Sequence, residues 1–132
     1  MGKGAYGKVH EIRKISAPNE HFACKILRKG FHVDDNVLYT PTERYILQNE
    51  VDILRTLNGD HHNLTLLEVY ESRSLIYIIT EYCELDLFEY VTTCFGGSSN
   101  IRLMDMSRIA YQLFDAIDYC VKNGIIHRGM LH

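Results

Sequence analysis

Hydrophobic residues follow two different periods on either side of about residue 83. In the first part, four segments rich in β-branched and aromatic residues are typical of strands, and their short connections favour an antiparallel meander. The first turn is expected at 17–20, where the composition favours turns. The four expected strands are 9–16, 21–27, 64–72 and 74–82.

One helix is expected within this strand-rich part. Thr40, Pro41 and Glu43 place a capping hydroxyl, a proline at the first helical position and a capping-box glutamate in order. The helix should continue to about Leu57, where an Asn-Gly pair follows.

After residue 83 the hydrophobic period becomes helical. A short helix is expected over 86–91 and a long one over 105–122, with Gly124 as its stop. The long helix carries an apolar stripe at three- and four-residue steps, made of Met106, Ile109, Ala110, Leu113, Ala116, Ile117 and Cys120.

Composition narrows the possible partners and compartments. The chain has 132 residues, 46% of them hydrophobic, and a net charge of −3, so no basic face indicates nucleic acid. The four cysteines lack paired CxxC spacing, which favours reduced intracellular thiols. No apolar run is long enough to span a bilayer, so we expect no membrane insertion and a cytoplasmic or nuclear protein. No metal site is expected, because His61 and His62 have no third ligand at a suitable spacing.

Three glycines near the beginning of the chain have a GxGxxG spacing. Gly2, Gly4 and Gly7 precede Val9, which begins the first expected strand. The bare motif fits a plain turn as well as a binding loop. A dinucleotide-binding fingerprint would open a helix, whereas a strand follows here, so these glycines indicate a hairpin that could place backbone amides over phosphates.

A lysine and a glutamate both interrupt apolar surroundings. Lys25 lies in a strand that is apolar on both faces; it is either an edge lysine or a covered ammonium that needs an anion. Glu50 lies in the apolar stripe of the first helix, so either that stripe is partly open or the carboxylate pairs with a cation from the sheet. We expect the two to pair.

The end of the last strand is a further candidate. The apolar run turns into a polar bend at Glu81 to Cys83, whose backbone groups could bond a flat heterocycle. Taken alone, this segment is better explained as a strand followed by a loop.

Together these features resemble the protein kinase family, in the family's own order and over essentially the whole chain. The resemblance implies an α+β fold. A kinase-like N-terminal lobe with hinge is expected over 1–83, with an antiparallel sheet that lacks most of the family's first strand and with one regulatory helix. The first helices of a helical lobe and the start of the catalytic loop are expected over 84–132. The matching segments are GKGAYGKV, FACK, NEVDILRTL, HHNLTLLEVYE, IITEYCE and QLFDAIDYCVKNGIIHRG.

The resemblance also implies a nucleotide site for ATP, with magnesium arriving only with ATP because no protein ligands for the metal are carried over. Gly2, Gly4 and Gly7 would cover the phosphates, and Lys25, oriented by Glu50, would hold the α- and β-phosphates. The remaining implied positions are Val9 and Ala23 against adenine, Thr80 as the gatekeeper, the backbone of Glu81 and Cys83 on the adenine edge, and Asp86 on the ribose.

The sequence departs from the family at the catalytic base. The family has His-Arg-Asp there, but this chain reads His127, Arg128 and Gly129, so no catalytic residue is expected at this position. The sequence also ends before the family's magnesium-binding segments. We therefore expect a partial, truncated protein kinase domain of the serine/threonine type that does not transfer phosphate by itself and binds ATP weakly or not at all. The alternatives are a pseudokinase remnant that binds nucleotide or protein, and a non-functional gene fragment.

A protein partner is expected from the long helix. Its stripe over 105–122 packs in the family against helices that these residues do not include, so we expect self-association or another protein chain on this face. Neither nucleic acid nor a membrane is expected as a partner.

Overall fold

The structure, a computed structural model, divides the chain into two compact units. The first consists of 1–58 and 64–82, and the second of 59–63 and 83–132. The residues that the structure describes are 3–4, 7–29, 31–33, 36–38, 41–95 and 103–126.

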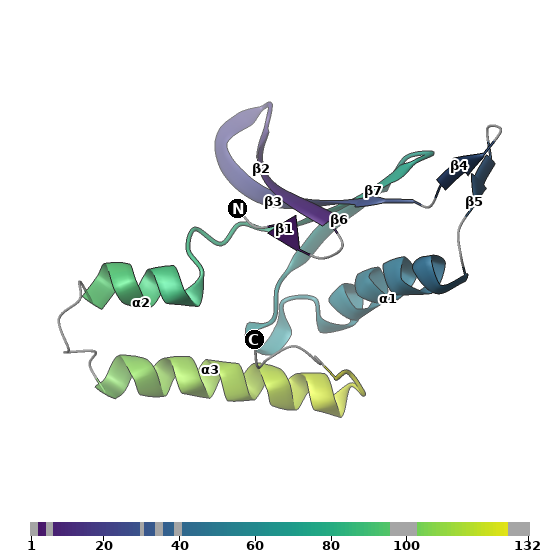
Figure 1. Cartoon of the computed structure of the whole chain (residues 1–132). Helices are drawn as coiled ribbons and strands as arrows, with labels where there is room; N and C mark the ends of the chain where they lie inside the picture. Colours follow the sequence, from purple (N-terminus) through teal and green to yellow (C-terminus); the bar gives the residue numbers. More distant parts are fainter. Residues whose placement is uncertain are drawn as a thin grey trace. The chain divides into compact units, whose positions relative to one another are not determined.

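The first unit is built on an antiparallel sheet of five strands, shown in Figure 1. All of its neighbouring strands pair antiparallel, as expected. The expected meander is wrong, because the strand at 17–28 pairs with the strand at 75–81, and the strand at 66–71 lies at the edge beyond it. In spatial order the strands are β1 (Lys3–Gly4), β2 (Gly7–Lys14), β3 (Ala17–Arg28), β7 (Leu75–Glu81) and β6 (Leu66–Glu71). A separate hairpin, absent from the sequence expectation, is formed by β4 (Phe31–Val33) and β5 (Asn36–Leu38).

The glycine-rich segment forms the hairpin that the sequence indicated. Gly4 pairs with Gly7 and Lys3 with Lys8, so β1 and β2 join at this point. Gly2 lies outside the described residues.

The turn between β2 and β3 differs from its expected position. It is formed by Ile15 and Ser16, and the residues expected to turn, 17–20, begin β3 instead. The ladder is irregular between Arg13 and Lys14, which gives the β3 side extra residues. Because Pro18 has no N–H to donate, an irregular part of the ladder accommodates it, and the two-residue turn forms before it.

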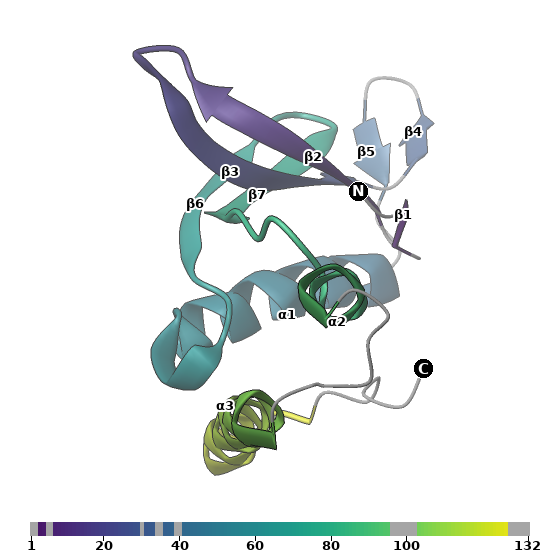
Figure 2. The ribbon, with the colours of Figure 1, turned by 90° about the vertical axis from the view of Figure 1, so that its left-hand side faces the viewer.

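Helix α1 (Pro41–Leu57) has the bounds that its capping residues predicted. Figure 2 shows it lying along one face of the sheet. The buried core of the first unit joins Val51 of α1 to Leu27 of β3 and Ile78 of β7, and the last two are essentially inaccessible to solvent. At its end the Asn58 N–H donates to the Leu54 carbonyl at 2.9 Å, which closes the last turn.

The second unit contains α2 (Leu87–Phe95), α3 (Leu103–Lys122) and the short 3-10 helix η1 (Asp60–His62). The first of these is longer than the expected 86–91, and α3 begins two residues before the expected 105. None of the helices in the described ranges is long and apolar enough to cross a membrane.

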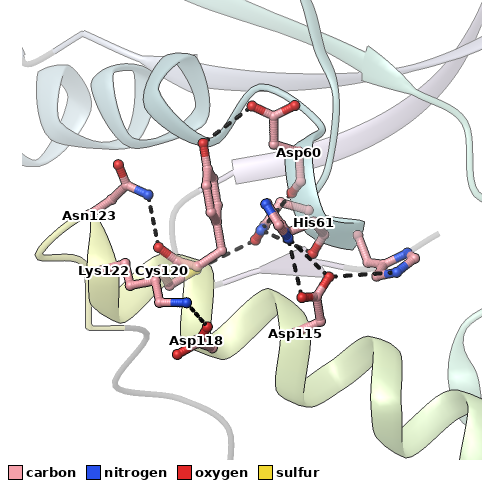
Figure 3. A network of polar contacts seen from close by, with 10 residues as sticks. Asp60, His61, Asp115, Asp118, Cys120, Lys122 and Asn123 are labelled. Carbon is pink, nitrogen blue, oxygen red and sulfur yellow. Dashed lines mark hydrogen bonds and ion pairs between the residues drawn. The ribbon is translucent and has the colours of Figure 1, made fainter.

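Polar contacts join η1 to α3, as Figure 3 shows. The His61 Nδ1 lies 3.2 Å from each carboxylate oxygen of Asp115, and the His62 Nε2 lies 3.7 Å from one of them. The His61 ring stacks on Tyr119 with centroids 4.4 Å apart, and the Tyr119 hydroxyl donates to Asp60 at 3.2 Å. The two histidines are thus exposed but tied to α3, and no group of three or more metal-ligating side chains was found among the described residues.

The apolar stripe of α3 is partly open within the described part of the chain. Met106 and Leu113 are 44% and 50% exposed, and the neighbouring Phe114 and Val121 are exposed further, at 69% and 63%. Self-association or docking of another protein on this face stays a prediction.

Leu27 should dominate the stability of the first unit. Leu27→Ala removes a fully buried side chain from the contact between α1 and the sheet, so we expect a loss of about 2–5 kcal/mol in the free energy of unfolding. Urea denaturation measures it. Ile15→Ala is the control, because Ile15 is 99% exposed and its loss should change stability by less than about 0.5 kcal/mol. Equal effects of the two changes would contradict this core.

The cysteines should differ in reactivity toward a thiol reagent. Cys24 of β3 is buried, and burial raises the pKa of its thiol, whereas Cys83 is exposed. A raised pKa leaves less thiolate at any given pH, so Cys24 should react slowly until the pH rises toward that raised pKa or the protein unfolds. Mass spectrometry after brief modification at about pH 8 should find label on Cys83 before Cys24. Faster labelling of Cys24 would contradict the burial.

Candidate nucleotide-binding site

Four of the expected site residues share one face of the sheet. Val9 is directly opposite Lys25 across β2 and β3, and Ala23 is directly opposite Thr80 across β3 and β7. Because directly paired residues and residues two apart on a strand point to the same face, these four side chains lie on a common surface. Ile78, opposite Lys25, belongs to the same face, which is therefore the one that α1 covers.

The expected lysine and glutamate meet on this face. The Lys25 Nζ donates to the Glu50 Oε1 at 2.5 Å, and their side chains are 29% and 28% exposed. Glu50 reaches the sheet because the adjacent Val51 is buried in the core and fixes α1 there. A pair this accessible contributes only about 0–1 kcal/mol to stability, so its main consequence is the placement of the ammonium.

That ammonium can still bind an anion. A protonated lysine has three donors, and Glu50 receives one of them. The partial exposure of Lys25 leaves room for a second partner, and Val9 and Ala23 beside it are also partly exposed apolar side chains. The face thus combines an oriented cation with an apolar surface.

The end of β7 has partners that the sequence did not indicate. The Glu81 N–H donates to the Thr65 carbonyl at 3.2 Å, and the Glu81 side chain accepts from the Thr65 N–H at 2.6 Å. The buried Thr80 hydroxyl donates to the Glu81 carbonyl at 3.2 Å. The Glu81 N–H is therefore bonded to Thr65, the residue before β6, while the Glu81 carbonyl keeps a second lone pair for another donor.

Asp86 caps helix α2. Its Oδ1 accepts from the Glu89 N–H at 2.7 Å, and its own N–H lies 3.4 Å from a Glu89 carboxylate oxygen. This reciprocal pattern is a capping box, and the acid three residues after Asp86 could have revealed it in the sequence. One oxygen of Asp86 is engaged by the cap, and the predicted ribose contact of this residue stays a prediction.

The remaining predicted positions are divided between the glycine hairpin, the second unit and the undescribed residues. Gly4 and Gly7 belong to the paired ends of β1 and β2. Cys83 is exposed at the start of the second unit's long segment. Gly2 and Gly129 lie outside the described residues.

Comparison with known proteins identifies the family. The family profile described as "Protein kinase domain" matches residues 1–130. The chain is 30% identical to "Cell division control protein 2 homolog D" of Antirrhinum majus and 31% identical to "NUAK family SNF1-like kinase 2" of Rattus norvegicus, in each case over 98% of this chain. It spans 41% and 19% of those two relatives, less than half of their length.

A solved structure shows the same fold. The match is to "Crystal structure of Rad53 1-466 in complex with AMP-PNP", with a TM-score of 0.69 and 23% identity, and it covers 98% of this chain and 30% of that one. The antiparallel sheet with α1, followed by α2 and α3, is accordingly that of a kinase N-terminal lobe and part of the helical lobe. Since the family profile covers nearly all of its residues, the chain belongs to the protein kinase domain family.

Proposed function

We propose that this chain binds ATP on the Lys25 face of its sheet, as the nucleotide-binding part of a serine/threonine protein kinase domain, and does not transfer phosphate by itself. The observation that carries the binding is the 2.5 Å contact between the Lys25 Nζ and Glu50, beside the apolar Val9 and Ala23. Such a surface offers charge to a polyphosphate and apolar contact to a base.

Both the phosphates and the base of ATP find complementary groups on this face. The phosphates carry the negative charge that the two remaining donors of Lys25 can bind. A flat heterocycle with an amino group suits Val9, Ala23 and the free lone pair of the Glu81 carbonyl. The nucleotide analogue named in the Rad53 structure supports the same choice. Magnesium would enter with the nucleotide, where it neutralises phosphate charge.

The serine/threonine assignment rests on the segment EYCELDLFEYV and on the kinases that the chain resembles. In the family, this class transfers the γ-phosphate of ATP to a hydroxyl. The chain's contribution in this proposal is to hold and orient the nucleotide.

Gly129 supports the absence of phosphate transfer. Glycine stands where the family has the aspartate that accepts the substrate's hydroxyl proton, and glycine has no side chain to replace it. A general base typically contributes about 10²–10⁴-fold to the rate of a reaction. Without a general base, the chain can bind the nucleotide, but transfer of the γ-phosphate is slowed by that factor or more.

ATP should stabilise the protein through Lys25. A ligand that binds the folded chain at 100 times its Kd adds about 2.7 kcal/mol, so saturating ATP should raise Tm by several degrees. Lys25→Ala should abolish that rise, since it removes the ammonium that binds phosphate, and Glu50→Gln should reduce it. Differential scanning fluorimetry with and without ATP measures the effect.

Lys14→Ala is the matched control. Lys14 is an exposed lysine at the end of β2, next to the turn between β2 and β3, and its Nζ lies 3.9 Å from the Glu20 carboxylate. Its loss should therefore leave the rise in Tm unchanged. If ATP raises Tm equally in the Lys25 and Lys14 variants, it does not bind where we propose.

Phosphate transfer should be undetectable. The 132-residue chain incubated with γ-labelled ATP, magnesium and a general protein substrate should incorporate no more label than its Lys25→Ala variant. The variant reports any contaminating kinase, because it is purified in the same way but lacks the phosphate-binding ammonium. Incorporation that requires Lys25 would show that the chain is an active enzyme in spite of Gly129.

A further inference from the structure

A ring contact extends the sheet beyond the end of β7. The last paired residues of β3 and β7 are Phe22 and Glu81, so His21 and Tyr82 are the next pair in the register. Their rings lie 5.7 Å apart between centroids at an interplanar angle of 41°. This separation is within the range of aromatic pairs, so the side chains continue the cross-strand contact where the backbone ladder has ended.

His21 is itself held in place by a polar cluster. Its Nδ1 lies 2.7 Å from the Glu11 Oε1, and the same oxygen accepts from the Arg13 Nε at 3.2 Å and Nη2 at 3.0 Å. Glu11 and Arg13 belong to β2 and His21 to β3, so the cluster joins adjacent strands. One carboxylate oxygen thus orients the ring that contacts Tyr82.

The carboxylate is ionised at neutral pH. Its hydrogen bond from Arg13 holds the pKa of the Glu11 carboxyl below its usual value of 4.5, against a smaller opposing effect of burial, and His21 acts in the same direction as Arg13. A lowered pKa keeps the acceptor charged above 4.5 and loses it only as the pH falls through that lowered value. The cluster is therefore complete across the neutral range.

The cluster lies next to the proposed nucleotide site. Glu11 is directly opposite Ala23, and His21 is two residues before Ala23 on β3, so they share the face that carries Ala23 and Lys25. Tyr82 is the last residue of the first unit, and the chain enters the second unit at Cys83. The ring contact thus acts on the residue that directly follows Glu81, and the Glu81 backbone is expected to bond the adenine edge.

We propose that His21, oriented by Glu11, is a positioning residue that braces Tyr82 and so sets the placement of the adjacent Glu81 carbonyl for the base of a bound nucleotide. The inference rests on the proposed binding of ATP. It assigns to His21 a role in recognising the base, and His21 is not among the nucleotide-binding positions carried over from the family. His21 does not touch the nucleotide in this proposal.

The test compares ATP with adenosine as probes. His21→Ala should weaken the binding of both by about 2- to 10-fold, the effect of one aromatic pair, because both contain the base. Lys25→Ala should weaken the binding of ATP much more than the binding of adenosine, because only ATP has phosphates. Dissociation constants come from NMR titration of the 132-residue chain. An unchanged Kd in His21→Ala, with wild-type binding intact, would overturn the proposal.

Two further variants separate positioning from general structural support. His21→Phe keeps a ring against Tyr82 and should restore most of the affinity that His21→Ala loses. His10→Ala is the control on β2: His10 is exposed and opposite Cys24, on the other face of the sheet, so its loss should change neither Kd. Equal weakening by His21→Phe and His21→Ala would show that the ring contact does not position the base.

Hydrogen exchange tests the brace without any nucleotide. The Tyr82 and Cys83 amides should exchange about 2- to 10-fold faster in His21→Ala than in His10→Ala, because the ring pair restrains this segment. If wild-type protein binds neither probe but exchange responds as expected, the proposed function fails and the brace stands. If exchange is the same in both variants, the brace fails whatever the nucleotide does.

Discussion

The packing of Val51 against Leu27 and Ile78 is the contact on which the candidate site depends. It holds α1 on one face of the sheet by burying apolar surface, which is the largest favourable contribution available to so small a unit. The ion pair of Lys25 and Glu50 contributes little stability of its own, since both side chains are more than a quarter exposed. Its 2.5 Å geometry is therefore a consequence of the core, and a cation is oriented where apolar packing has already placed the two backbones.

Charge is arranged along a single face of the sheet in two clusters with different effects. Near the core, Glu50 orients Lys25, whose register partner on β2 is Val9. Toward the β2–β3 turn, Glu11 orients a histidine toward the segment that follows β7. In both cases a carboxylate uses one oxygen to fix a group that remains partly accessible. In the proposed site, the phosphate end and the base end of the nucleotide would lie over neighbouring positions of one sheet, which suits a precise site.

Much of the fold and part of the site could be predicted from local sequence. The capping residues of α1 defined its bounds, since a helix end depends on residues next to it. The turn expected at 17–20 was wrong because Pro18 could be accommodated at an irregularity of the ladder, which depends on the partner strand. The strands β4 and β5 were missed because three residues are too few to show a period. The capping box of Asp86 was available in the sequence and was overlooked.

The sequence by itself determined the family, the three longer helices and the four main strands of the sheet, because those properties follow from residue type and spacing. It also predicted that Lys25 pairs with Glu50, which the contact at 2.5 Å confirms, whereas the partial exposure of both side chains came only from the tertiary structure. Only the tertiary structure placed Asp115 between two adjacent histidines, and His21 beside Tyr82. The reason is physical: these partners are far apart along the chain, and their meeting depends on strand register and helix docking, which the whole fold decides.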